Sequence, residues 1–330
     1  MNMQTEKRST SVHYMQLPAW AGIKSQFGWK TEHIKSTSLR SDVEVYKRFV
    51  PGVGNLFYIP GVAGVTTENA GEFTEEFRAR YKQKGFGIRL ELNQPEKVEL
   101  LEKLQLQGWK KTKTHIQYRH TVKVDLSLSE DNIWMSLKSR GRYEVLQAQK
   151  FGVVVEDAEP TDENLQKMYE LMQVTSTRNK FYIRDMKFTM AYWHKFREAG
   201  QLKLFFAWHD TDLLSGAIIL TSGKLAWYKD GGSTRTKSNL MAARLLQWEA
   251  MKSLKKSGIE TYDLGGIPSP ESQHTSSMHG IYVFKTAYSK NSVALMPTLE
   301  MPLSGRYALW PKAEKHWLRI YNLFAHNLWW

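Results

Sequence analysis

Apolar and polar residues alternate along this chain in short blocks, and the period of the alternation changes repeatedly between helical and strand-like. In residues 17–30 the apolar positions recur at helical spacing and predict a short amphipathic helix. Residues 86–92 alternate as a strand does, and residues 98–106 return to the helical period before stopping at Gly108. The pattern therefore predicts a chain in which helices and strands are mixed.

The same reading covers the rest of the sequence. Further helices are expected at 72–81, 132–151, 165–174, 188–199, 239–257 and 310–330, and further strands at 43–50, 56–59, 115–126, 153–156, 202–208, 217–221, 224–229, 261–264, 282–288 and 293–297. Each half runs through helices and meandering strands to a final helix and strand. This order predicts mixed α/β sheets built on a duplicated plan.

Length and polarity indicate how the helices and strands are divided between domains. A chain of 330 residues is long for one core and suits two domains. The polar, Ser-rich stretch at 125–131 is the best candidate for the boundary.

Charge narrows the class of partner. Lys and Arg total 46 against 33 Asp and Glu, which gives a formal charge of +13. Such an excess favours an anionic partner, namely nucleic acid, a nucleotide-linked substrate or an acidic membrane surface; a generally basic, soluble surface is the alternative. The sequence has no cysteine, which excludes disulfides, thiolate metal sites and cysteine nucleophiles.

Hydropathy predicts no signal peptide and no membrane span, because no window holds about 18 apolar residues. A cytoplasmic protein is expected. Residues 310–330 combine several Trp with Lys312, Lys315, His316 and Arg319. This amphipathic helix either packs on a core, which we favour, or lies at the inner face of the cell membrane.

Two short segments carry candidate chemistry. Gly265 and Gly266 follow a predicted strand, where they allow a sharp turn or a close approach of the backbone to a ligand. Lys285 lies in an aromatic, strand-like run, where its ammonium could bind a phosphate or stabilise an oxyanion; an edge-strand lysine is the alternative.

A third candidate is the basic helix that includes Lys138, Arg140 and Arg142, which is typical of either a phosphate-backbone contact or a solvated helix face. Established catalytic templates are missing: there is no Walker A loop, no G-x-S-x-G, no H-E-x-x-H and no metal-ligand spacing of histidines. The loop typical of acetyl-CoA binding is also missing. We therefore expect neither a metal nor a cofactor.

Several strings in order resemble a known family. They are Y-D-L-G-G-I at 262–267, Y-V-F-K at 282–285, W-A-G-I-K at 20–24 after Gln16, and W-Y at 227–228 followed by G-G-S at 231–233. Together they resemble the Fem family of non-ribosomal peptidyl transferases, and its compact FemX-like members in particular. The resemblance implies an α+β fold of two N-acetyltransferase-like domains with a cleft between them and no coiled-coil arm.

The resemblance also implies domains. Residues 1–128 with 304–330 would bind the precursor, and residues 129–303 would hold the aminoacyl-tRNA side.

Site residues follow by position. Lys24 and Arg184 match two cations on the diphosphate side of the precursor, and Tyr228 and Trp20 match substrate-side aromatics. Two positions are substituted, since Phe188 and Asp230 stand where the family has tyrosines. Three further matches lie near the reaction, namely Glu91, Phe284 and Lys285.

The implied activity is the transfer of an amino acid from aminoacyl-tRNA to the side-chain amine of a peptidoglycan precursor, either lipid II or UDP-MurNAc-pentapeptide, by a monomer. Lys285 would stabilise the oxyanion or contact the tRNA end, Glu91 would orient or deprotonate the amine, and Lys138, Arg140 and Arg142 would bind tRNA. Three alternatives stay open: an N-acyltransferase with another donor or acceptor, a non-catalytic nucleic-acid-binding protein, and a membrane-surface protein.

Overall fold

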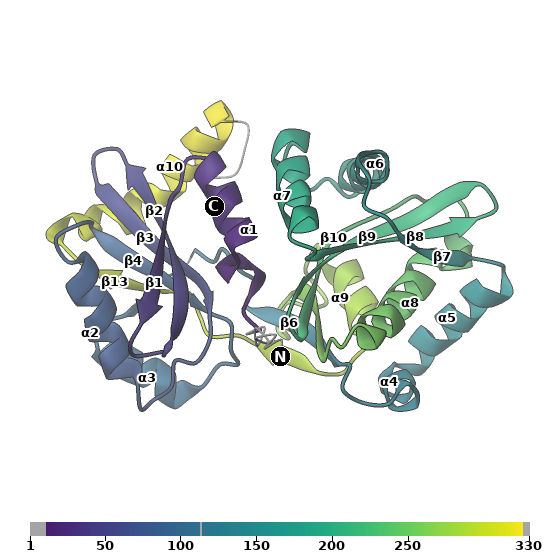
Figure 1. Ribbon diagram of the computed structural model, residues 1–330, viewed down its shortest axis with the longest axis horizontal. Coiled ribbons are helices and arrows are strands. Elements are labelled where there is room, and N and C mark those ends of the chain that lie inside the picture. Colours follow the sequence, from purple (N-terminus) through teal and green to yellow (C-terminus); the bar gives the residue numbers. More distant parts are fainter. Residues whose placement is uncertain (1–10, 113, 326–330) are drawn as a thin grey trace, which may run out of the picture.

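Two mixed β-sheets stand side by side in the computed structural model, which describes residues 11–112 and 114–325 (Figure 1). The first sheet has the order β1 (Lys30–Ser36), β2 (Ser41–Val50), β3 (Gly54–Val62), β4 (Gly87–Leu92), β13 (Leu299–Pro302) and β5 (Lys110–Lys111). The second has the order β12 (Ser292–Ala294), β6 (His120–Asp125), β11 (Thr261–Ile267), β10 (Leu225–Ser233), β9 (Asp212–Ser222), β8 (Leu202–His209) and β7 (Val154–Ala158). Each sheet contains one parallel pair, β3 with β4 and β10 with β11.

Helices cover both faces of each sheet. They are α1 (Pro18–Gln26), α2 (Ala70–Tyr81), α3 (Val98–Leu106), α4 (Glu130–Ser136), α5 (Ser139–Lys150), α6 (Asp162–Asn179), α7 (Met186–Glu198), α8 (Ala242–Lys256), α9 (His279–Lys285) and α10 (Trp310–Ala325), with 3₁₀ turns η1 (Tyr14–Gln16), η2 (Ser238–Leu240) and η3 (Gly305–Leu309). On the first sheet, α2 and α3 pack on one face and α1 and α10 on the other. On the second, α6 and α7 oppose α5 and α8.

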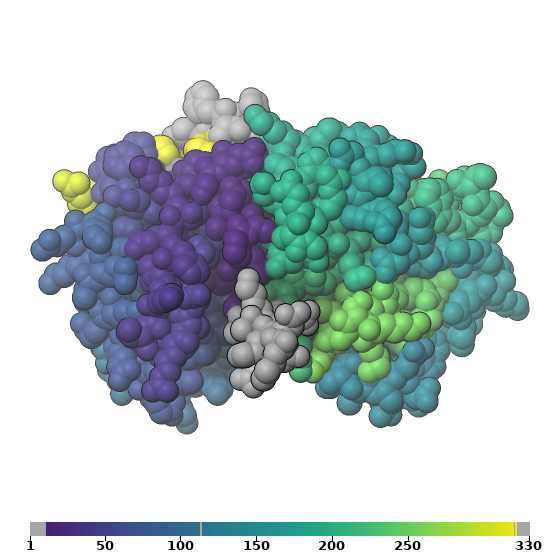
Figure 2. Space-filling view, viewed as in Figure 1, coloured from purple at the N-terminus to yellow at the C-terminus, as the bar shows by residue number. Residues whose placement is uncertain are grey.

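The two domains share one apolar core where α1 meets α7. Trp20 of α1 contacts Phe188, Tyr192 and Phe196 of α7 edge to face or tilted, with ring centroids 6.2 to 6.5 Å apart. The first domain and the second meet along the middle of the molecule (Figure 2). Such aromatic pairs add to the area that they bury, so this contact fixes how the domains meet.

The chain passes between the sheets at residues 114–119 and 295–298, not at the polar stretch 125–131. Strand β6, which the expected boundary placed in the first domain, pairs with β11 and β12 of the second sheet. Strand β13, expected in the second, pairs with β4 and β5 of the first. The polar stretch is a surface turn whose Ser129 accepts a hydrogen bond from the Asn132 amide and so begins α4.

Most predicted elements are present within about a turn, and residues 98–106 form α3 as expected. The predicted helix 132–151 is instead two helices, because Leu137 and Lys138 have extended backbone with ψ of 143° and 148°. Strand β1 was missed, since its only buried positions are Ile34 and Ser36. Residues 326–330 of the predicted last helix lie outside the described residues.

The predicted strand 282–288 is wrong. Residues 279–285 form the helix α9, with helical hydrogen bonds from the Tyr282 amide to the Met278 carbonyl and from the Thr286 amide to the Tyr282 carbonyl. The aromatic and β-branched residues of this segment favour a strand locally, but packing against the second sheet overrides that weak preference.

Helix α10 packs on the first sheet through a buried ion cluster, as favoured above. Arg89, fully buried on β4, bonds Glu300 of β13 at 2.8 Å and Glu314 of α10 at 2.7 Å. The paired carboxylates satisfy a charge that would otherwise be costly inside the protein. In the described part of the chain, no helix combines the length and the apolar character needed to span a membrane.

Candidate functional site

Four cations from four separate elements converge between the domains. Lys24 lies on α1, Arg48 on β2, Arg184 just before α7 and Lys229 on β10. Lys24 is only 2% exposed, and burial followed by repulsion from the other three lowers its pKa well below the usual value. Burial also lowers the pKa of Arg48, of Arg184 and of Lys229, the last to about 8. The structure therefore holds like charges together at an electrostatic cost.

Aromatic rings hold these cations in place. The Lys24 ammonium lies 5.4 Å from the ring centre of Trp20 and 5.3 Å from that of Trp29. The Arg184 guanidinium lies 4.4 Å from the ring centre of Phe188, which is itself buried. Two residues expected to contact substrate, Trp20 and Phe188, thus support the cations through cation–π contacts.

Hydrogen-bond donors in the same region are without acceptors. The Trp20 indole Nε1 and the Tyr192 hydroxyl are buried and have no hydrogen-bond partner among the described residues. The Lys24 ammonium, which lies beside the Trp20 and Trp29 rings, likewise forms no hydrogen bond or ion pair with a described residue. Buried donors of this kind cost free energy, and a bound anion would satisfy them. The arrangement has the chemistry of an anion site.

Strand β10 is bulged beside these cations, between Tyr228 and Asp230. Asp230 accepts a hydrogen bond from the Trp193 indole at 3.0 Å and lies 3.7 Å from the Lys229 ammonium. Burial raises the pKa of Asp230 to about 7, although the charge of Arg184 tends to lower it. Burial therefore favours the protonated form of this carboxyl group more than water does.

A cavity of about 530 Å³ opens beside the bulge and extends to the end of α9. Five residues predicted from the sequence line it: Arg184, Tyr228, Asp230, Phe284 and Lys285. The structure thus brings residues from three distant parts of the chain to one cavity. A cavity of this size accommodates part of a nucleotide or peptide.

Lys285 ends α9 at one side of the cavity. Its ammonium donates a hydrogen bond to the Gly266 carbonyl at 2.9 Å. Burial lowers the pKa of Lys285 to about 8, although the charge of Asp263 tends to raise it. Gly265 has φ +78°, and a Cβ on Gly266 would lie 2.6 Å from the Tyr118 ring. The paired glycines lie inside β11 at a bulge, where they permit the close approach that the sequence indicated.

Asp263 is a neighbour of Lys285 that the sequence reasoning did not single out. One of its oxygens accepts from the Thr121 hydroxyl and from the Gly265 amide, the latter at 2.8 Å, and burial raises its pKa. Phe284, by contrast, stacks under the Arg244 guanidinium at 4.7 Å. Asp263 lies in the motif string, but only the fold shows that its charge is close enough to interact with that of Lys285.

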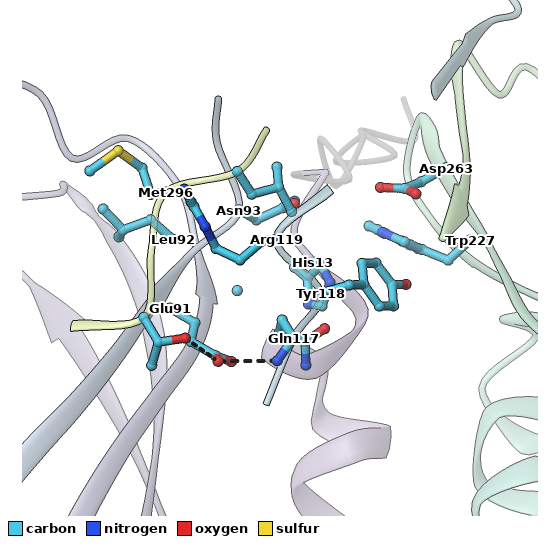
Figure 3. A pocket seen from close by; sticks show the side chains of 13 residues that line it. His13, Glu91, Leu92, Asn93, Gln117, Tyr118, Arg119, Trp227, Asp263 and Met296 are labelled. Carbon is cyan, nitrogen blue, oxygen red and sulfur yellow. Dashed lines mark hydrogen bonds between the residues drawn. The ribbon is translucent and has the colours of Figure 1, made fainter. Parts of the chain in front are cut away.

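Glu91 lines a separate, small cavity between the domains (Figure 3). Its carboxylate accepts hydrogen bonds from the Tyr58 hydroxyl at 2.5 Å, the Thr298 hydroxyl at 2.8 Å, and the amides of Ile116 and Gln117 at 3.0 and 3.1 Å. Four donors already occupy the carboxylate. The geometry therefore makes Glu91 an anchor for both connecting segments.

The basic residues in and just before α5 form hydrogen bonds or ion pairs with neighbouring residues. Lys138 donates to the Thr286 hydroxyl at 3.1 Å, which places it next to the end of α9. Arg140 pairs with Glu144 at 2.8 Å, and Arg142 donates to main-chain carbonyls at the end of α4. Among the residues that the structure describes, no group of His, Cys, Asp and Glu side chains could hold a metal ion.

Comparisons with known proteins agree with this architecture. The acetyltransferase (GNAT) domain family matches residues 137–276. Lipid II:glycine glycyltransferase of Staphylococcus haemolyticus is 23% identical over 83% of this chain and 84% of its own length, and that of S. aureus strain MRSA252 is 21% identical over 86% of each. The crystal structure of FemX has a TM-score of 0.80 at 19% identity and covers 95% of this chain and 99% of its own. The expected fold of two N-acetyltransferase-like domains is confirmed.

The anchoring role of Glu91 can be tested by replacing it with Gln. The amide would turn its NH₂ group toward at least one donor, so we expect a loss of about 1–3 kcal/mol in unfolding free energy, measured by urea denaturation. Glu99→Gln, on the exposed surface of α3, is the matched control and should change stability by less than about 0.5 kcal/mol. Unchanged stability in Glu91→Gln, together with lost turnover, would contradict the anchor.

Proposed function

Because the chain is an acyltransferase of the Fem family, we propose that it transfers an amino acid from aminoacyl-tRNA to the side-chain amine of a peptidoglycan precursor. One observation carries the proposal: the cation cluster around Lys24 and the cavity that ends at Lys285 share Arg184 and Lys229 on one surface between the domains. The cation cluster would bind a diphosphate, and the cavity that ends at Lys285 would hold the reacting groups.

The cation cluster would bind the diphosphate of the precursor. Lys24 and Arg184, with Arg48 and Lys229 beside them, offer charge-assisted hydrogen bonds that match a dianion. Lipid II and UDP-MurNAc-pentapeptide both carry a diphosphate. We favour the lipid-linked form as acceptor because the relatives above are named for lipid II.

The donor would enter the cavity of about 530 Å³. The acceptor nitrogen attacks the ester carbonyl, the bond from that carbon to the ribose oxygen breaks, and the ribose oxygen takes up a proton as the amide forms. The ester is already activated, so positioning and oxyanion stabilisation suffice. Lys285 has one donor on the Gly266 carbonyl, and its ammonium retains two for the oxyanion or the tRNA end.

Other residues would contact the acceptor or the donor. Tyr228 lies with its ring centre 6.0 Å from the Lys285 ammonium and would pack against the acceptor chain. Asp263, whose charge interacts with that of Lys285, joins Glu91 as a candidate for holding the acceptor ammonium, and both line the small cavity between the domains. Lys138 lies beside α9 and, with Arg140 and Arg142, would contact the tRNA backbone. The diphosphate of the precursor would then lie between the two domains, and the donor on the second.

Replacement of Lys24 with Met should weaken binding of UDP-MurNAc-pentapeptide, which serves as a soluble probe, by about ten- to a hundredfold in calorimetry, and Arg184→Ala should do the same. The folded state lowers the pKa of Lys24, so its charge destabilises the fold at neutral pH. Lys24→Met should therefore also raise the melting temperature. Exposed Lys187→Met is the control for both measurements. Unchanged affinity in Lys24→Met would reject the diphosphate site.

Lys285→Met should lower kcat by about a hundred- to a thousandfold with precursor affinity within about twofold. Lys285 has a pKa of about 8, so its ammonium form is present below pH 8 and lost above it. The parent rate should thus fall on the alkaline side near pH 8, while in Lys285→Arg this fall should disappear because guanidinium stays charged. Identical pH profiles of kcat in the parent and Lys285→Arg would refute the role.

A further inference from the structure

The outward face of α10 is a stripe of cations. Lys312, Lys315, His316 and Arg319 are exposed, and their spacing of three and four residues places them on one side of the helix. None of them forms a salt bridge with a carboxylate in the described part of the chain. The single acidic residue of α10, Glu314, is buried against Arg89 on the inward side.

The inward face of α10 carries the aromatic residues whose side chains the structure describes. Trp310 is fully buried, and Trp317, Leu318 and Tyr321 pack against the core shared by the two domains. A helix that lies within the membrane interface would turn these rings toward lipid. Here the rings that the structure describes are used for packing, and the four cations lie on the opposite side of the helix. The contact that this cationic face offers is therefore mainly electrostatic.

Helix α10 also adjoins the cation cluster of the site. The Tyr321 hydroxyl accepts a hydrogen bond from Arg48, whose guanidinium lies 4.6 Å from the Tyr321 ring centre. Arg48 stacks in turn on Trp29, the ring that also faces Lys24. One member of the cluster proposed to bind the diphosphate, Arg48, thus contacts α10 directly.

We propose that the cationic face of α10, defined by Lys312, Lys315, His316 and Arg319, docks on the surface of an anionic phospholipid bilayer. The inference rests on the proposed function, because a lipid-linked diphosphate lies at the bilayer surface. Docking through α10 would bring the cluster around Lys24 to the depth of that diphosphate. Leu309, 54% exposed at the start of the helix, would lie against the same surface.

Anionic lipid suits this face better than the other polyanion in the reaction, tRNA. Helix α10 packs on the first sheet, whereas the cavity that ends at Lys285 lies on the second. Each basic residue at an anionic membrane surface contributes about fivefold to partitioning, and the attraction decays within a Debye length. Three lysine and arginine residues therefore suffice for reversible, salt-sensitive binding.

The test is sedimentation of the full chain with vesicles of phosphatidylcholine containing about 30% phosphatidylglycerol. The triple variant Lys312→Glu, Lys315→Glu, Arg319→Glu should bind at least about a hundredfold more weakly than the parent. A control with the same change in charge, Lys82→Glu, Lys97→Glu, Lys103→Glu, alters exposed lysines by α2 and α3 on the opposite face of the first sheet and should bind within about threefold of the parent.

Activity separates this inference from the proposed function. The α10 variant should keep parental turnover with soluble UDP-MurNAc-pentapeptide and lose it with lipid II in anionic vesicles. Equal vesicle binding by the parent and the α10 variant would overturn the docking surface, and so would a loss of tRNA affinity in that variant with vesicle binding intact. A parent that binds vesicles through α10 but transfers nothing to either acceptor would overturn the function and leave the docking surface standing.

Discussion

The buried carboxylate of Glu91 joins the two segments that connect the sheets. It accepts from the amides of Ile116 and Gln117 in the first connection and from the Thr298 hydroxyl in the second, while Tyr58 fixes it to the first sheet. The relative position of the two domains, and hence the surface between them, depends on this group. The aromatic contact of α1 with α7 completes the arrangement from the opposite end.

The surface so formed is electrostatically unfavourable in the absence of a ligand. Arg48, Arg184 and Lys229 each repel the charge of Lys24, and the Trp20 indole and the Tyr192 hydroxyl are buried donors without acceptors in the described structure. Residues that serve stability alone would not be arranged in this way, because each of these features costs free energy. A dianionic ligand would remove both costs at once, which is why this surface is assigned to the diphosphate.

Local periodicity was enough to predict elements such as α3, and the resemblance singled out Arg184, Tyr228 and Lys285, which the fold brings to one cavity. Other features depend on tertiary contacts that no local pattern carries. The segment 279–285 folds as α9 against its own β propensity, and Arg48 joins the cluster only because β2 lies next to α1 and α10. Glu91 was matched by its position in the sequence, but its role follows from the connecting segments that the fold brings to it.

The central claim is that this surface joins an amino acid carried by tRNA to a precursor amine. The most direct measurement is to incubate the purified protein with lipid II and a mixed pool of charged tRNAs, and to determine product masses. The account predicts that lipid II gains the mass of one or more aminoacyl residues, and that the gain disappears when the tRNAs are deacylated. An unchanged mass with charged tRNA, together with acylation from acyl-CoA, would contradict it.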